Sequence, residues 1–147
     1  MDANRFQYWE EKRFGGEVKG CYSWSRRNDW AYKISQMLII LFSSLTTAAL
    51  ALGKIFPSFP GQVYAIAGSF IVTFAASSLK VFHFQEKALF YAEKYDALMQ
   101  EQAQFMTADG EYIEAGNKEE LFVQKVEKII SESNKRREII YYSPKTE

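Results

Sequence analysis

The side chains that could do chemistry in this sequence are mostly serine and threonine hydroxyls inside two uncharged stretches, residues 34–53 and residues 55–79. In both stretches, small and hydroxylated residues recur at every fourth position, which places them on one broad side of a helix. Such hydroxyls bond to the helix backbone and let helices pack closely, or they line a water-filled path once several chains assemble. The candidates for pore lining or helix packing are Ser43, Thr47, Ser69, Thr73 and Ser77.

Catalytic chemistry is not expected. The single histidine, His83, has no cysteine or second histidine near it in sequence, so it lacks both metal co-ligands and a nucleophile to activate. We expect it to be an interfacial side chain or, alternatively, a pH-sensitive contact. The sequence has no Gly-rich phosphate loop after a strand, no Gly-X-Ser-X-Gly motif and no Cys-X-X-Cys pair. We therefore predict a protein that is not an enzyme and that has no cofactor and no metal.

The elements that carry these hydroxyls are long enough to cross a membrane. About 20 helical residues cover the ~30 Å hydrocarbon core of a bilayer. The sequence predicts a first transmembrane helix at residues 34–53 and a second at residues 61–79. Between them, residues 54–60 contain one charge, Lys54, and two prolines, which predict a short hairpin loop. The expected fold class is all-α, with a two-helix transmembrane hairpin and no room for a catalytic domain beside it.

Basic and aromatic residues border the hairpin. Seven lysines and arginines precede the first stretch and ten follow the second, against one in the loop, so the positive-inside rule places both termini in the cytoplasm. Aromatic rings with a polar edge lie at the headgroup level, where basic side chains reach phosphates. A nucleic-acid surface would use the same residues, but their position beside a membrane span disfavours it. The predicted membrane-interface anchors are Trp24, Arg26, Arg27, Trp30, Lys33 and Lys80.

Residues 1–33 form a cytoplasmic N-terminal segment of amphipathic or interfacial character. Phe6, Trp9 and Arg13 have helical spacing, but we expect three glycines between residues 15 and 20 to interrupt the helix. Two interpretations remain open at this point. The segment is either a partly ordered polar lead-in or a helix that lies on the bilayer surface.

The second span is expected to run on as a cytoplasmic helix over residues 80–107, because no proline or glycine interrupts it. Its apolar residues recur at spacings of three and four from Val81 to Phe105, the repeat of a coiled coil. Both parts would then form one helical rod. An Asp-Gly pair at residues 109–110 predicts a turn after it.

A C-terminal helix is predicted at residues 117–141. Asn117 can cap its first turn, and Glu120 stands three residues later, as in a capping box. We expect this amphipathic helix to fold back antiparallel on the rod, because the turn between them is short.

The order of these parts resembles the SLATT family of small bacterial membrane proteins, two-transmembrane effectors that associate with SMODS nucleotidyltransferases and SLOG nucleotide-sensing domains. The resemblance covers roughly residues 22–140 and rests on YSWSRRNDWAYK before the hairpin and LKVFHFQEKALFYAEKYDALMQEQAQFM after it. One departure is Ala92-Glu93-Lys94, where the family pattern has an arginine. The positions that look like family motif positions are Phe82, Glu86, Tyr91, Leu98 and Glu101.

The resemblance implies a single SLATT-like domain over residues 1–147 in a bacterial inner (cytoplasmic) membrane. It implies a homo-oligomeric, pore-forming effector of an anti-phage or conflict system, gated by a nucleotidyltransferase or nucleotide-sensing partner in trans. The alternative is a non-conducting membrane scaffold or accessory subunit that docks a cytoplasmic partner through its coiled coil. A third possibility is a soluble bundle in which the two uncharged stretches are core helices.

Overall fold

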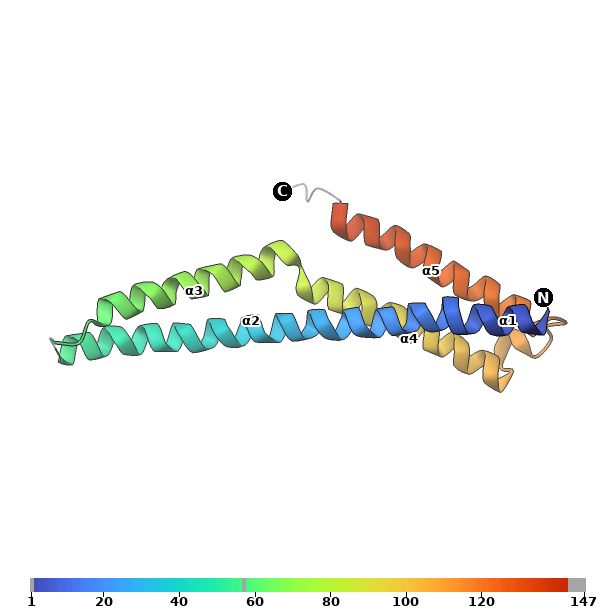
Figure 1. The fold of residues 1–147 in the computed structure, drawn as a ribbon, viewed down its shortest axis with the longest axis horizontal. Coiled ribbons are helices and arrows are strands. Elements are labelled where there is room, and N and C mark those ends of the chain that lie inside the picture. Colours follow the sequence, from blue (N-terminus) through green and yellow to red (C-terminus); the bar gives the residue numbers. More distant parts are fainter. Residues whose placement is uncertain (1, 57, 143–147) are drawn as a thin grey trace. The chain divides into compact units, whose positions relative to one another are not determined.

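The computed structural model describes residues 2–56 and 58–142, except for the side chains of residues 3 and 139–142. All regular elements in this part of the chain are helical, so the all-α prediction is confirmed. The elements are α1 (Ala3–Trp9), the π-helical turn η1 (Glu10–Phe14), α2 (Gly15–Ile55), α3 (Gly61–Phe82), α4 (Phe84–Thr107), the 3-10 turn η2 (Gly110–Tyr112) and α5 (Lys118–Tyr142) (Figure 1).

The chain divides into two compact units. The hairpin unit consists of Arg26–Lys87, and the three-helix unit combines Met1–Ser25 with Ala88–Glu147. The helices Asn4–Ile55 and Gly61–Phe82 are each long and apolar enough to cross a membrane, as the sequence predicts. The expected loop also lies where the sequence places it, between the end of α2 at Ile55 and the start of α3 at Gly61.

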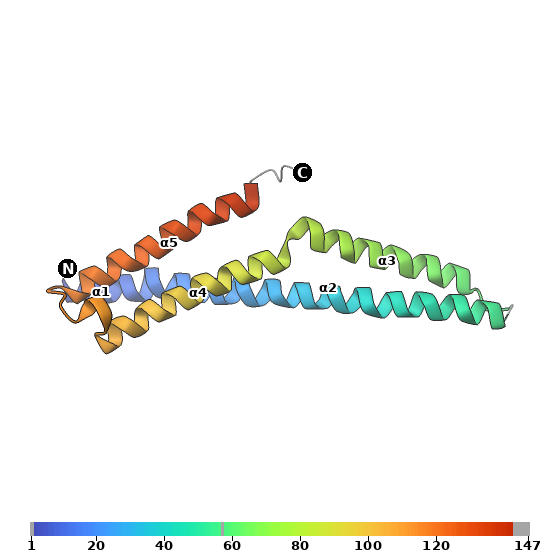
Figure 2. The ribbon, with the colours of Figure 1, turned by 180° about the vertical axis from the view of Figure 1, so that it is seen from behind.

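In the hairpin unit, α3 lies antiparallel beside α2, and the two backbones approach closely (Figures 1 and 2). A Cβ added to Gly61 would overlap the carbonyl oxygen of Ala49, and one added to Gly68 would overlap the hydroxyl of Thr46. Close approach of this kind needs small residues, because a larger side chain would force the backbones apart. The buried residues of α3 are accordingly small: Gly61, Ala65, Gly68 and Ala75. We call these residues, with Ala49 and Gly53 of α2, the hairpin seam.

The prediction of one continuous rod after the second span is wrong. α3 ends at Phe82, His83 has a left-handed backbone with φ 48°, and α4 starts at Phe84. The rings of Phe82 and Phe84 stack across the break with centroids 5.4 Å apart. Side chains two residues apart point away from each other in a continuous helix, so this stacking requires the interruption. No proline or glycine marks the position, which is why the pattern of helix breakers does not reveal it.

The prediction that glycines interrupt the N-terminal segment is also wrong. The chain is helical from Ala3 to Ile55, and Phe6, Phe14 and Cys21 are buried in the three-helix unit. Each glycine in a helix interior costs about 1 kcal/mol relative to alanine. Burial of one phenylalanine side chain contributes roughly 1.5–3 kcal/mol, so the two buried phenylalanines together offset three glycines. The segment is therefore neither a polar lead-in nor a surface helix but a core element of its unit.

The core of the three-helix unit joins α1, η1 and the start of α2 to α4 and α5. Phe105 of α4 stacks on Phe122 of α5 with centroids 4.6 Å apart, and Phe6 lies 5.7 Å from Phe105. α5 is antiparallel to α4, since Arg136 pairs with Glu93 at one end and Phe122 meets Phe105 at the other. The most deeply buried side chains are Leu98, Tyr112, Phe122, Val126 and Ile130.

Local chemistry ends α4 and starts α5 where the sequence predicts. α4 ends at Thr107, the N–H of Ala108 donates to the carbonyl of Phe105, and the N–H of Asp109 donates to that of Gln104. This is a Schellman motif. At the start of α5, the Asn117 side chain accepts from the N–H of Glu120 at 3.2 Å. The Glu120 carboxylate accepts from the Asn117 side-chain amide at 3.0 Å.

Ala108→Gly is expected to stabilise the protein by about 1 kcal/mol. Ala108 closes α4 with a left-handed backbone, φ 51°, where a Cβ is strained and glycine is not. The free energy of unfolding of the full chain, measured by denaturant titration in maltoside micelles, checks this. The control is Ala103→Gly, inside α4, which should destabilise by a similar amount. Equal effects of the two substitutions would contradict the assigned backbone.

Candidate functional site

The five hydroxyl candidates lie outside the hairpin seam. All five side chains are exposed within the chain. The Ser69 hydroxyl donates to the carbonyl of Ala65 at 2.8 Å, and the Thr73 hydroxyl donates to the carbonyl of Ser69 at 2.8 Å. Thr47 donates in the same way to Ser43 at 3.1 Å. The hydroxyls of Thr47, Ser69 and Thr73 are therefore satisfied within their own helices. Ser69 and Thr73 line an open groove that Thr46 and Leu50 of α2 also border.

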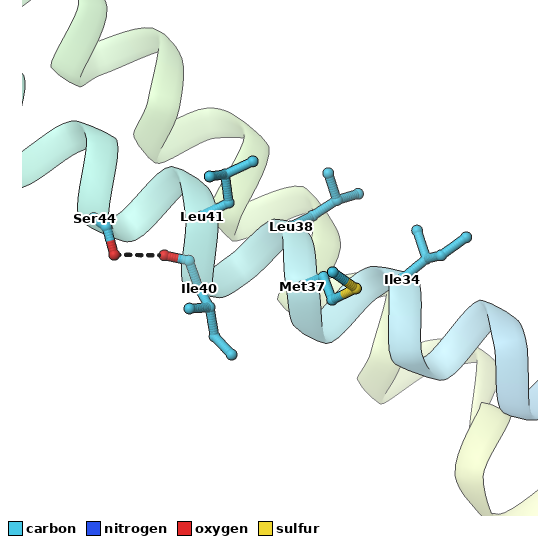
Figure 3. A pocket seen from close by; sticks show the side chains of 6 residues that line it. All are labelled: Ile34, Met37, Leu38, Ile40, Leu41 and Ser44. Carbon is cyan, nitrogen blue, oxygen red and sulfur yellow. Dashed lines mark hydrogen bonds between the residues drawn. The ribbon is translucent and has the colours of Figure 1, made fainter.

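The neighbouring surface of α2 is apolar. A shallow hollow of about 630 Å³ is lined by α2 residues alone, and the one hydroxyl on it, that of Ser44, donates to the carbonyl of Ile40 at 2.9 Å (Figure 3). A hollow with one helix as its wall and no free polar group offers nothing to orient a polar ligand. The lining residues are Ile34, Met37, Leu38, Ile40, Leu41 and Ser44.

The predicted interface anchors fall into two groups. Trp30 and Lys80 are exposed in the hairpin unit, and the Lys33 ammonium pairs with Asp29 at 2.7 Å. Arg26 and Arg27 are exposed in the same unit. Trp24 differs, because it belongs to the three-helix unit and stacks on Tyr91 with ring centroids 6.1 Å apart.

A polar cleft of about 360 Å³ lies in the three-helix unit, between η1, the start of α2, α4 and α5. Trp24 and Tyr91 form part of its wall, and Asn134 adds an amide. Cys21 and two glycines, Gly16 and Gly20, line it on the α2 side. Four basic side chains reach the cleft, against one acidic side chain, that of Glu17; the basic residues are Lys12, Arg13, Lys94 and Arg137.

An ion-pair chain forms the floor of this cleft. The Lys94 side chain is only 6% exposed, and its ammonium lies 3.0 Å from the Glu17 carboxylate. Glu17 is also 3.4 Å from Arg13, whose Nε and Nη2 donate to both carboxylate oxygens of Glu127 at 3.2 and 3.3 Å. The hydrogen bond with Glu127 raises the pKa of Arg13 further above its ordinary value. The ion pairs hold these side chains in one geometry.

The surroundings of Cys21 do not activate its thiol as a nucleophile. Burial raises the pKa of its thiol, and this effect exceeds that of the Lys94 ammonium, which lowers it. A neutral thiol is a poor nucleophile and a poor metal ligand. Among the residues that the structure describes, no group of three or more His, Cys, Asp or Glu side chains could hold a metal ion.

The positions singled out by the family resemblance are spread over both units. Phe82 stacks on Phe84, and Glu86 lies 3.3 Å from His83. Tyr91 lies at the cleft, and Leu98 is fully buried. The structure thus does not gather these five positions into one site.

Glu101 is the centre of a polar cluster in the core. The Tyr112 hydroxyl donates to the Glu101 carboxylate, and the Lys125 ammonium lies 3.5 Å from the same carboxylate and 4.9 Å from the centre of the Tyr112 ring. Burial, followed by the hydrogen bond to Glu101, raises the pKa of Tyr112. Tyr112 therefore remains a neutral donor that satisfies a partly buried carboxylate, which is a structural role.

Sequence reasoning missed the cleft. Lys94 is buried although the sequence pattern did not single it out, and Glu17 and Arg13 lie in a segment expected to be interrupted. A signal was present, because Lys94 falls between Tyr91 and Leu98 on the apolar side of the coiled-coil pattern. A lysine that is buried there needs a counter-charge, and Glu17 supplies it from a third helix.

Comparison of the chain with protein families, with curated proteins and with solved structures finds no match.

Proposed function

We propose that this chain is an inner-membrane protein that assembles into a membrane-permeabilising homo-oligomer. The observation that carries the proposal is the exposure of its apolar helices. The most apolar 18-residue window of the helix Asn4–Ile55 is only 6% buried inside the chain. The corresponding window of Gly61–Phe82 is 17% buried. A core helix of a soluble bundle would bury most of such a window, so a bilayer is the better environment for these surfaces. Exposed large residues include Met37, Ile40, Ile66, Phe70 and Phe74.

A pore would require several copies of the hairpin. Two helices cannot enclose a pore, and the side chains of Ser69 and Thr73 are exposed outside the hairpin seam. Several hairpins that place this side of α3 inward would surround a path lined by hydroxyls. Their apolar surfaces, including the hollow of Figure 3, would then face lipid.

The biological role comes from the resemblance to the SLATT family. It suggests an effector of a bacterial anti-phage or conflict system, with both termini in the cytoplasm and no enzymatic activity of its own. A nucleotidyltransferase or nucleotide-sensing partner in trans would gate it by binding one state more tightly than the other. A scaffold or accessory subunit remains the rival function, and it predicts no leakage under any condition.

The double substitution Ser69→Leu with Thr73→Leu is expected to lower leakage at least tenfold. Leucine replaces a hydroxyl-lined wall with an apolar one, which excludes ions and water. The measurement is release of a self-quenching dye, and of K⁺ against a gradient, from vesicles that contain the purified full chain.

Ser44→Leu is the matched control. It makes the same chemical change on the apolar surface of α2, beside Ile40 and Leu41, and should leave leakage within about twofold. Absence of leakage from wild-type vesicles, with depolarisation also absent in cells that overproduce the chain, would favour the scaffold. If the double variant leaks as fast as wild type, the hydroxyls of Ser69 and Thr73 do not line the path.

A further inference from the structure

We propose that the cleft of the three-helix unit is a binding site for a small phosphate-bearing anion. Lys94 and Arg13 are engaged with Glu17 and Glu127, but neither Lys12 nor Arg137 has an acidic side chain within ion-pair distance among the described residues. Two basic groups of the lining are thus available to an incoming anion. Arginine matches phosphate oxygens through two parallel N–H donors, and lysine adds a point charge.

The size and lining of the cleft define the class of ligand. A volume of about 360 Å³ lies at the lower end of small-molecule sites and is too small for a protein helix. Asn134 offers an amide for hydrogen bonding, and the exposed ring of Trp24, backed by Tyr91, offers a flat apolar wall. A phosphate group attached to a compact body fits these features better than a purely apolar compound.

Two glycines supply the second, independent observation. Gly16 and Gly20 are one helical turn apart in α2 and both line the cleft. Nothing lies within 4 Å of a Cβ added to either, and neither has a positive φ. Packing and backbone conformation therefore give no reason for glycine, although each one weakens the helix. The two glycines leave open space in the cleft beside the ion pairs. Any larger side chain at these positions would fill the space that we assign to the ligand.

The backbone beside the floor is unusual as well. Lys12 and Arg13 belong to η1, a π-helical turn between α1 and α2. Single π-helical turns inside α-helices are uncommon and frequently lie at functional sites, because they re-aim the side chains that they carry. Here the turn brings two consecutive basic residues to the rim of the same cleft.

The test is isothermal titration of the purified full chain in maltoside micelles, a detergent without phosphate, at 150 mM KCl. Two probes separate the sources of the anion: pyrophosphate for a free ligand, and phosphatidic acid mixed into the micelles for a lipid headgroup. Three variants are compared with wild type. Arg137→Gln removes an available cation, Gly20→Leu fills the cleft while improving helix propensity, and Lys135→Gln makes the same charge change on α5 outside the cleft.

Saturable binding of pyrophosphate is expected, weakened roughly tenfold by Arg137→Gln, abolished by Gly20→Leu and changed less than twofold by Lys135→Gln. The same pattern with phosphatidic acid alone assigns the site to a lipid headgroup. Absence of saturable binding with both probes would overturn the proposal, and so would equal losses in Arg137→Gln and Lys135→Gln. Vesicle leakage does not enter the measurement, so its outcome is independent of the permeabilising function.

Discussion

Glu17→Gln should lower the free energy of unfolding by about 3 kcal/mol. The change leaves the Lys94 ammonium, whose side chain is 6% exposed, without the carboxylate that lies 3.0 Å away. Removal of one partner of a buried ion pair costs roughly 3–5 kcal/mol, and the partial exposure of Glu17 places the effect at the lower end. Denaturant titration of the full chain in maltoside micelles, followed by circular dichroism, measures it.

Two further variants make this result specific. Glu127→Gln breaks the exposed pair with Arg13 and should cost less than about 1 kcal/mol. The double variant Glu17→Gln with Lys94→Met removes both charges and should recover most of the loss, because a buried methionine needs no counter-charge. If Glu17→Gln and Glu127→Gln lowered the free energy of unfolding equally, Lys94 would have to be solvated. That result would contradict the burial of Lys94 in the structure.

Gly61→Ala should destabilise the hairpin unit by about 2–3 kcal/mol. The added Cβ would overlap the carbonyl oxygen of Ala49, a backbone atom that can move only if α2 and α3 separate. Overpacking of a tight contact typically costs roughly 1–3 kcal/mol, and a rigid backbone neighbour places the value at the upper end. Unfolding in mixed maltoside and dodecyl sulfate micelles, with helix content as the signal, is the measurement.

The same substitution elsewhere provides a graded control. Gly53→Ala meets its nearest atom, the Cα of Gly61, at 3.3 Å and should cost less than about 1 kcal/mol. Gly16→Ala meets nothing within 4 Å and should stabilise by about 0.5–1 kcal/mol through helix propensity. If Gly61→Ala were as stable as Gly16→Ala, the close approach of the two helices would be excluded.

Features encoded by local chemistry were predictable from the sequence. The two apolar helices follow from the length of the uncharged stretches, the loop from its prolines, and the start of α5 from Asn117. Each depends on the composition of one continuous stretch of sequence. The break at His83 and the continuity through Gly15, Gly16 and Gly20 were not predictable, because each depends on packing that local propensities do not contain.

The candidate hydroxyls show a similar limit. Steps of four residues drift by about 40° per step around a helix, so a pattern that starts at Gly61 and Ala65 leaves the contact face by Ser69. The buried positions instead alternate steps of four and three, from Gly61 through Ala65 and Gly68. The sequence shows which residues are small, whereas contact between α2 and α3 determines which of them are buried. The cleft was beyond prediction for the same reason, since its cations come from three helices.

The hairpin seam has a consequence for how the proposed membrane protein would enter a bilayer. Because α2 and α3 meet through small residues and their outward hydroxyls already bond to their own backbones, the hairpin can enter lipid as a finished pair. In the proposed topology, with both termini in the cytoplasm, only the residues between Ile55 and Gly61 and the side chain of Lys54 would pass to the far side. Insertion in that topology would therefore require the transfer of one charge across the hydrocarbon core.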